Sequence, residues 1–159
     1  MHRFYWDASV FSAWLNKEEG RFDICDAILR AAEEGQVKIV TSAITLVEVF
    51  GYSLAELHGG NLSHQQITDK DYQVESLFNA EYIEVVNVDR FIARTARDLR
   101  RNHPQLRRKT IDAIHIASAL NTEVEELHSY DTEDMLKLSS IKGLKIIMPH
   151  WDTQLPLLK

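Results

Sequence analysis

The 159-residue chain carries 45% hydrophobic and 26% charged residues, which is ordinary for a globular protein with one sizeable core. Its formal charge of −6 argues against a protein that coats nucleic acid through a strongly cationic surface, but not against a nuclease with a local basic patch. A single cysteine, Cys25, excludes an internal disulfide and a cysteine zinc site. Without a secretory leader or an apolar run of about 20 residues, we expect a cytoplasmic protein with no membrane partner.

Hydrophobic patterns in the first half of the chain alternate between strand and helix periods. We expect strands at residues 3–6 and 37–40, and helices at about 8–16, 22–34 and 64–78, the last of which reads as one helix or two. A further helix should follow Thr41 and Ser42, turning Ile44, Val47 and Leu54 toward the core. The stretch 58–63 is the clearest flexible point.

The second half continues the alternation. We expect strands at residues 82–86, 126–130 and 143–148, and helices at about 89–101, 109–120 and 131–138. Pro104 breaks the first of these helices, because proline cannot continue a helix. The pattern predicts a three-layer α/β/α sandwich around a mostly parallel sheet, with residues 1–150 as a single domain and 151–159 as a C-terminal tail.

The predicted helix at 109–120 is apolar nearly all round, so it should be buried, yet Asp112 lies in its first turn. A buried carboxylate requires a cationic or hydrogen-bonding partner. Arg107, Arg108 and Lys109 directly precede it, but these long side chains can also reach solvent. The identity of the partner of Asp112 is therefore the main question that the sequence raises.

Parallel strands place their carboxyl ends along one edge of a sheet, where ligands bind. Asp7 follows the first predicted strand and Asp131 the fourth, while Glu48 is expected about two turns into the helix after the second. Each acid has a simpler explanation: Asp7 and Asp131 as helix caps, Asp112 as a first-turn acid, and Glu48 on a solvated face. Together they predict a cluster of carboxylates.

Converging carboxylates repel each other unless a cation lies between them. An all-oxygen ligand set suits Mg²⁺ or Mn²⁺ rather than zinc. Such ions, held by a few carboxylates and several waters, typically act on phosphate esters. The sequence therefore favours a metal-dependent phosphodiesterase.

These residues resemble the PIN-domain family. The resemblance rests on Asp7-x-Ser9, the isolated Glu48, the segment Lys109–Ala117 and Ser129-Tyr130-Asp131, and it covers roughly residues 4–148. It implies a Mg²⁺- or Mn²⁺-dependent endoribonuclease acting on RNA, commonly the toxin of a VapBC-type pair. Such toxins bind an antitoxin protein whose C-terminal segment covers the acidic groove, and often form homodimers.

By that resemblance Asp7, Glu48, Asp112 and Asp131 match the catalytic and metal-binding acids, and Ser9 the supporting hydroxyl. Two departures stand out. Ala8 replaces a Thr or Ser that many members carry after the first Asp, and the usual second acid after Asp131 is displaced to Asp134. Asp134 is therefore ranked as a supporting residue.

Residues 100–109 form the one dense basic stretch and run directly into Asp112. A solvated loop is the simple explanation; the functional one is an RNA contact through Arg107, Arg108 and Lys109 beside the acids. His115, one turn after Asp112, is expected to be a core histidine or to support the site.

Three alternative functions make different demands on the sequence. A receiver-like Mg²⁺-binding signalling domain needs an acidic pair after the first strand and an acceptor Asp after the third. A haloacid-dehalogenase-type phosphatase needs Asp-x-Asp after the first strand. This chain has Asp7-Ala8-Ser9 there, which supplies neither the acidic pair nor Asp-x-Asp. A PIN fold used only as a non-catalytic RNA-binding or scaffold module remains open, although filled acidic positions argue against it.

Overall fold

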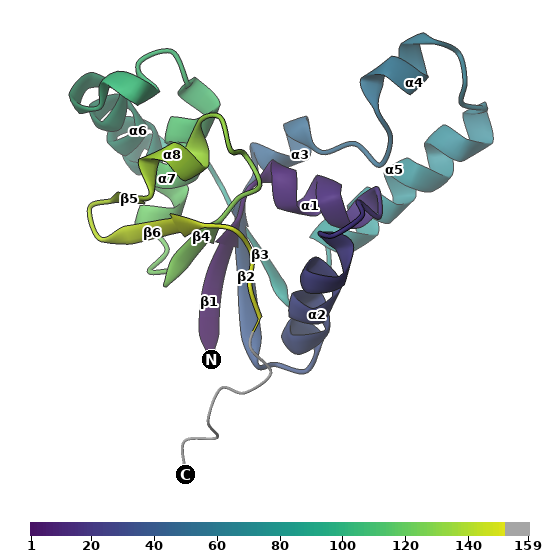
Figure 1. Ribbon diagram of the computed structural model, residues 1–159, viewed down its shortest axis with the longest axis horizontal. Helices are drawn as coiled ribbons and strands as arrows, with labels where there is room; N and C mark the ends of the chain where they lie inside the picture. The colour runs from purple at the N-terminus through teal and green to yellow at the C-terminus, as the bar shows by residue number, and fades with distance from the viewer. Residues whose placement is uncertain (152–159) are drawn as a thin grey trace.

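A computed structural model describes residues 1–151 of the protein (Figure 1). Its six strands form one sheet in the order β3-β2-β1-β4-β6-β5, in which every pair is parallel except β5 with β6. The strands are β1 (His2–Trp6), β2 (Val37–Ser42), β3 (Ile83–Val86), β4 (Glu126–His128), β5 (Ser140–Ile141) and β6 (Leu144–Ile147). The predicted mostly parallel sheet is confirmed.

Helices cover both faces of the sheet. They are α1 (Ala8–Leu15), α2 (Phe22–Glu33), α3 (Thr45–Glu48), α4 (Leu54–His58), α5 (His64–Phe78), α6 (Arg90–Asn102), α7 (Thr110–Leu120) and α8 (Met135–Leu138), with a 3₁₀ turn at Pro104–Leu106. Phe4 and Trp6 of β1 face α1, α2 and α5, whereas Tyr5 faces α6 and α7. This alternation along one strand produces two apolar cores and confirms the three-layer sandwich.

The helix after β2 differs from the prediction. Instead of one long helix, α3 is a single turn that ends at Glu48, and Val49 is already extended (φ −89°, ψ 118°). The expectation that Val47 and Leu54 face the core is wrong, because they are 68% and 49% exposed. The β-branched and aromatic residues before Gly51, and Gly51 itself, have low helix propensity and therefore disfavour a longer helix.

The chain then forms an arm of two helices that projects from the sheet on the right of Figure 1. Capping boxes start both helices, Ser53 with Glu56 in α4 and Ser63 with Gln66 in α5. The predicted helix at 64–78 is a single one, and its buried residues, Val74, Leu77 and Phe78, lie in its last turns. Only that end of α5 therefore belongs to the core.

The C-terminal region contains two further differences. The strand expected at 126–130 ends at His128, and the short antiparallel edge strand β5 was not predicted. Trp151 packs against Phe4, with ring centroids 6.5 Å apart, while the rest of the proposed tail lies outside the described residues. The division into a domain at 1–150 and a tail remains a prediction. No helix within residues 1–151 has the length and apolar character to cross a bilayer.

Candidate metal and nuclease site

Asp7 follows β1 directly and is the N-cap of α1, as the simpler explanation expected. Its Oδ1 accepts hydrogen bonds from the backbone N–H of Ser9 at 2.9 Å and from the Ser9 hydroxyl at 2.5 Å. The carboxylate is 95% buried, and this burial raises its pKa, although the Ser9 and Ser129 hydroxyls and His115 oppose the rise. Capping thus holds a buried acid at the carboxyl end of the sheet.

Ser9 connects the first acid to the loop after β4. Its Oγ, besides donating to Asp7, accepts the backbone N–H of Tyr130 at 2.8 Å. Ser129 Oγ in turn accepts the N–H of Asp131 at 3.0 Å. Two segments more than 120 residues apart in the chain are therefore joined at the sheet edge, so the supporting hydroxyl expected at Ser9 contacts both.

Asp112, Asp131 and Asp134 form a close group that we call the acidic trio. One carboxylate oxygen from each lies within 4.8 Å of the others. Burial raises the pKa of Asp112 to about 6, and the charges of Asp131 and Asp134 add to the rise. Asp131 also caps the following turn, because its Oδ1 accepts the N–H groups of Glu133 and Asp134 at 3.0 Å each.

The trio resolves part of the question about Asp112. Arg107 and Arg108 make no ion pair within residues 1–151, and Lys109 bonds to Asp134 at 2.5 Å rather than to Asp112. Asp112 therefore faces two other carboxylates and one nearby cation. The trio includes Asp134, which the sequence had ranked only as support, and it does not include Asp7 or Glu48.

Glu48 is held by His115. The histidine Nε2 donates to Glu48 Oε2 at 2.6 Å, and its Nδ1 lies 2.8 Å from the Tyr5 hydroxyl. His115 is 98% buried, whereas the Glu48 side chain is 31% exposed. The Tyr5–His115–Glu48 chain was not predicted; the signal available in the sequence was the position of His115 three residues after Asp112, on the same side of α7.

A second group of potential ligands lies on β4 and after β6. Glu126 accepts from His150 Nε2 at 3.0 Å and from His128 Nε2 at 3.4 Å, and these contacts lower the pKa of Glu126 to about 2. His128 Nδ1 is buried without a partner among the described residues. A metal on Nε2 would place the proton on Nδ1 and leave that N–H without an acceptor, so we assign no metal to this group.

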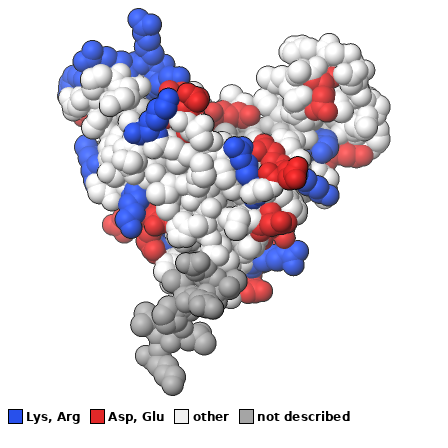
Figure 2. Space-filling model, in the orientation of Figure 1, with Lys and Arg blue, Asp and Glu red and all other residues white. Residues whose placement is uncertain are grey.

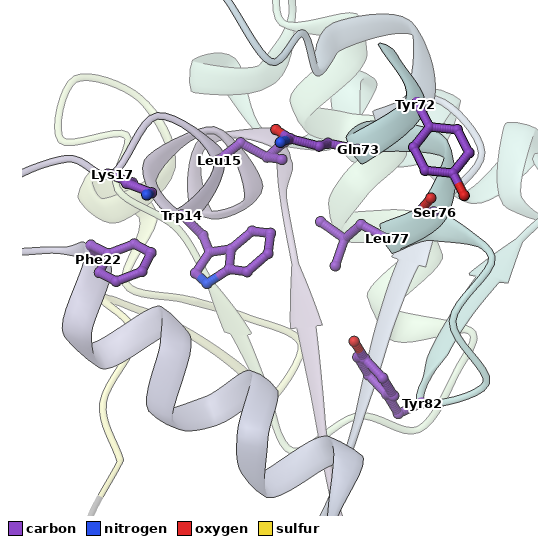
Figure 3. Close-up of a pocket in the computed structure, with 9 residues that line it drawn as sticks. All are labelled: Trp14, Leu15, Lys17, Phe22, Tyr72, Gln73, Ser76, Leu77 and Tyr82. Atoms are coloured by element: carbon purple, nitrogen blue, oxygen red, sulfur yellow. The ribbon is translucent and has the colours of Figure 1, made fainter. Parts of the chain in front are cut away.

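An apolar groove of about 420 Å³ lies away from the acids, between α1, α2 and α5. Figure 3 shows aromatic rings from four parts of the chain facing it: Trp14, Phe22, Tyr72 and Tyr82. None of the candidate acids lines it. The groove is therefore separate from the candidate site.

Comparisons with solved structures agree with this fold. VapC20 of Mycobacterium tuberculosis, described as a sarcin-ricin loop cleaving toxin, superposes with a TM-score of 0.60 at 14% identity, covering 89% of this chain and 98% of that one. A toxin–antitoxin complex from Klebsiella pneumoniae gives 0.58 at 18% identity over 93% and 98%. DNA-bound VapBC from Salmonella typhimurium gives 0.57 at 19% identity over 92% and 97%.

No curated protein sequence matches the chain. The family model for the PIN domain, however, matches residues 4–140, which include all the candidate acids and the whole of the predicted motif segment. At these low identities the solved structures establish the fold, and the family model adds the sequence relationship. The chain therefore belongs to the PIN-domain family.

Proposed function

We propose that this protein is a Mg²⁺- or Mn²⁺-dependent endoribonuclease and the toxin of a VapBC-type pair. The family to which it belongs is one of nucleases. The observation that carries the proposal is the acidic trio, in which three carboxylates converge on one point and Asp112 has a pKa raised to about 6. Three carboxylates this close together are unfavourable in a protein unless a cation binds between them.

The residues present fit a hard divalent cation. Every candidate ligand is a carboxylate oxygen, which Mg²⁺ and Mn²⁺ prefer, and all three acids of the trio are partly exposed. Asp112, Asp131 and Asp134 would hold the ion. Asp7 and Glu48 are linked to this group through His115, which bonds to Glu48 and whose charge acts on both Asp7 and Asp112. When bound, such an ion lowers the pKa of an attacking water and neutralises charge on the phosphate.

The protein's own groups position the reactants. Ser9 fixes the Asp7 carboxylate, and His115 fixes Glu48, so neither acid has to reorganise when RNA binds. Lys109 neutralises part of the trio through Asp134. Arg107 and Arg108 are exposed and adjacent to Lys109 in the sequence, and we propose that they contact the RNA backbone.

RNA cleavage with and without EDTA tests the proposal. We expect cleavage in Mn²⁺ or Mg²⁺, its loss in EDTA, and a loss of about 10²- to 10³-fold in Asp112→Asn and Asp131→Asn. Asp23→Asn, an exposed carboxylate on α2, is the matched control and should cleave normally. Cleavage that survives both EDTA and the two variants contradicts the proposal, whereas RNA binding without cleavage by any form favours the scaffold alternative.

The proposed antitoxin is supported by the fold, since several similar structures are toxin–antitoxin complexes. The product of a neighbouring reading frame, expressed together with this chain, should purify with it and suppress its RNA cleavage. We also propose a homodimer, as the family resemblance implies, and light scattering of the isolated chain tests it. A neighbouring product that neither binds nor inhibits removes the toxin assignment but leaves the nuclease assignment intact.

A further inference from the structure

Positive charge is concentrated in one segment of this acidic protein. Residues 90–109 contain eight of the 18 Lys and Arg and a single acid, Asp98, so the segment carries a formal charge of +7 and the rest of the chain −13. Figure 2 shows Lys and Arg gathered at the upper left, where Figure 1 draws α6. The basic region therefore includes a whole helix and is not limited to the loop before Asp112.

Four arginines of α6 form one line, which we call the arginine stripe. They are Arg90, Arg94, Arg97 and Arg101, all exposed. At about 100° per residue they fall within an arc of roughly 60°, opposite the buried Ile92, Ala96 and Leu99. The stripe extends for about 17 Å along the helix, at 1.5 Å per residue.

This arrangement is unfavourable for the isolated helix. Like charges three and four residues apart repel each other, and Arg90 occupies the first helical position, where the helix dipole disfavours a cation. Only Arg101 has a carboxylate partner, Asp98 at 2.8 Å; within residues 1–151 the other three make no ion pair or side-chain hydrogen bond. An external polyanion would compensate these charges.

The stripe is joined to the candidate site. At the C-terminal end of α6, the Arg100 guanidinium donates to the Arg107 carbonyl at 2.7 and 3.1 Å. Two residues later, Lys109 bonds to Asp134 of the acidic trio. Basic groups thus continue from the acids through 107–109 to α6.

We infer that the arginine stripe binds the phosphate backbone of the RNA strand where it extends beyond the cleavage site. This inference rests on the proposed function. A stripe of about 17 Å exceeds the size of one phosphate, so it fits successive phosphates. Phe91, 70% exposed beside Arg90, favours RNA over an acidic protein segment, because base stacking on aromatic rings accompanies basic grooves in single-strand binders.

Binding of two RNAs with the same central sequence, five and 20 nucleotides long, tests the inference. Measurements use the Asp112→Asn background, so that no cleavage interferes. Relative to this background, Arg90→Gln/Arg94→Gln/Arg97→Gln should bind the long RNA about tenfold or more weakly at low salt and reduce the slope of log K against log salt by about 2. Affinity for the short RNA should change little, so the advantage of length should largely disappear.

The control replaces three exposed cations elsewhere, Lys17→Gln/Arg30→Gln/Lys142→Gln, with the same change in charge. It should keep the salt slope and the length advantage. The inference is overturned if both triple variants lose the same affinity for the long RNA. It is also overturned if the slope of log K against log salt is unchanged in the stripe variant. A stripe variant that loses affinity for a polyglutamate peptide while retaining that for RNA overturns it as well. Because binding is measured without cleavage, these outcomes are independent of the EDTA test.

Folding of the stripe variant is checked by its melting temperature. Gln is a good helix former, and removal of like charges on α6 should leave the melting temperature unchanged or higher. Phe91→Ala provides a second, uncharged variant: it should weaken long-RNA binding about tenfold without altering the salt slope. Long-RNA binding that Phe91→Ala leaves unchanged contradicts the stacking contact and with it the choice of RNA over an acidic peptide.

Discussion

The two parts of the acidic site differ in how their charge is balanced. Asp7 and Glu48 receive hydrogen bonds from fixed donors, Ser9 and His115. In the acidic trio the carboxylates face each other, and Lys109 is the one cation within ion-pair distance among residues 1–151. The positions of Asp7 and Glu48 therefore do not depend on a bound ion. The repulsion among the carboxylates of the trio, in contrast, is relieved only when a cation binds.

The largest expected effect follows from removing charge from the trio. In metal-free protein at pH 7.5, Asp112→Asn should raise the melting temperature by several degrees, because the wild-type carboxylate is ionised while partly buried and beside the charges of Asp131 and Asp134. Thermal unfolding in EDTA measures this, with Asp23→Asn as control. A lower melting temperature for Asp112→Asn would mean that burial and the neighbouring carboxylates do not destabilise the ionised form of Asp112.

The sign of the pH dependence follows from the raised pKa of Asp112. The folded state favours the protonated form of Asp112. Its favourable contribution to the free energy of unfolding is therefore fully present below the unfolded pKa of about 3.9 and is lost as pH rises through about 6. Burial raises the pKa of Asp7 in the same direction. The advantage of Asp112→Asn over wild type should therefore be small at pH 4.5 and grow toward pH 7.5; a constant difference contradicts this account.

A smaller effect is expected from removing the hydrogen bond between His115 and Glu48. His115→Gln should reduce RNA cleavage about 10- to 100-fold, as is typical when the partner of a ligating carboxylate is lost. Tyr5→Phe removes only the hydroxyl that contacts His115 and provides a milder variant if His115→Gln folds poorly. In a double-mutant cycle, His115→Gln and Glu48→Gln should be far from additive, whereas additive losses would show that His115 acts on another group.

The smallest effect should come from Ser9→Ala. Loss of the hydroxyl that joins Asp7 to Tyr130 should lower the free energy of unfolding by about 1–2 kcal/mol and reduce cleavage only modestly. Ser12→Ala, on the same helix, is the matched control. Urea denaturation compares the two, and equal stabilities would indicate that the Ser9 bridge contributes nothing.

The sequence by itself determined the layer architecture and pointed to most of the candidate acids. Alternation of strand and helix patterns predicted the parallel sheet, because hydrophobic periodicity records which faces are buried. Asp7, directly after β1, and Asp112, in the first turn of α7, could be assigned to one sheet edge since parallel strands share their polarity. The family match now covers the segments that carry these residues.

Tertiary structure alone decided which side chains meet. The pairing of Glu48 with His115 and the entry of Asp134 into the trio depend on contacts between residues at least 22 positions apart. Local propensity carries no information about such contacts. Asp112 shows both contributions. Its burial and its convergence with Asp131 were predicted from the sequence, whereas the approach of Asp134 depends on the contact between α7 and the loop after β4.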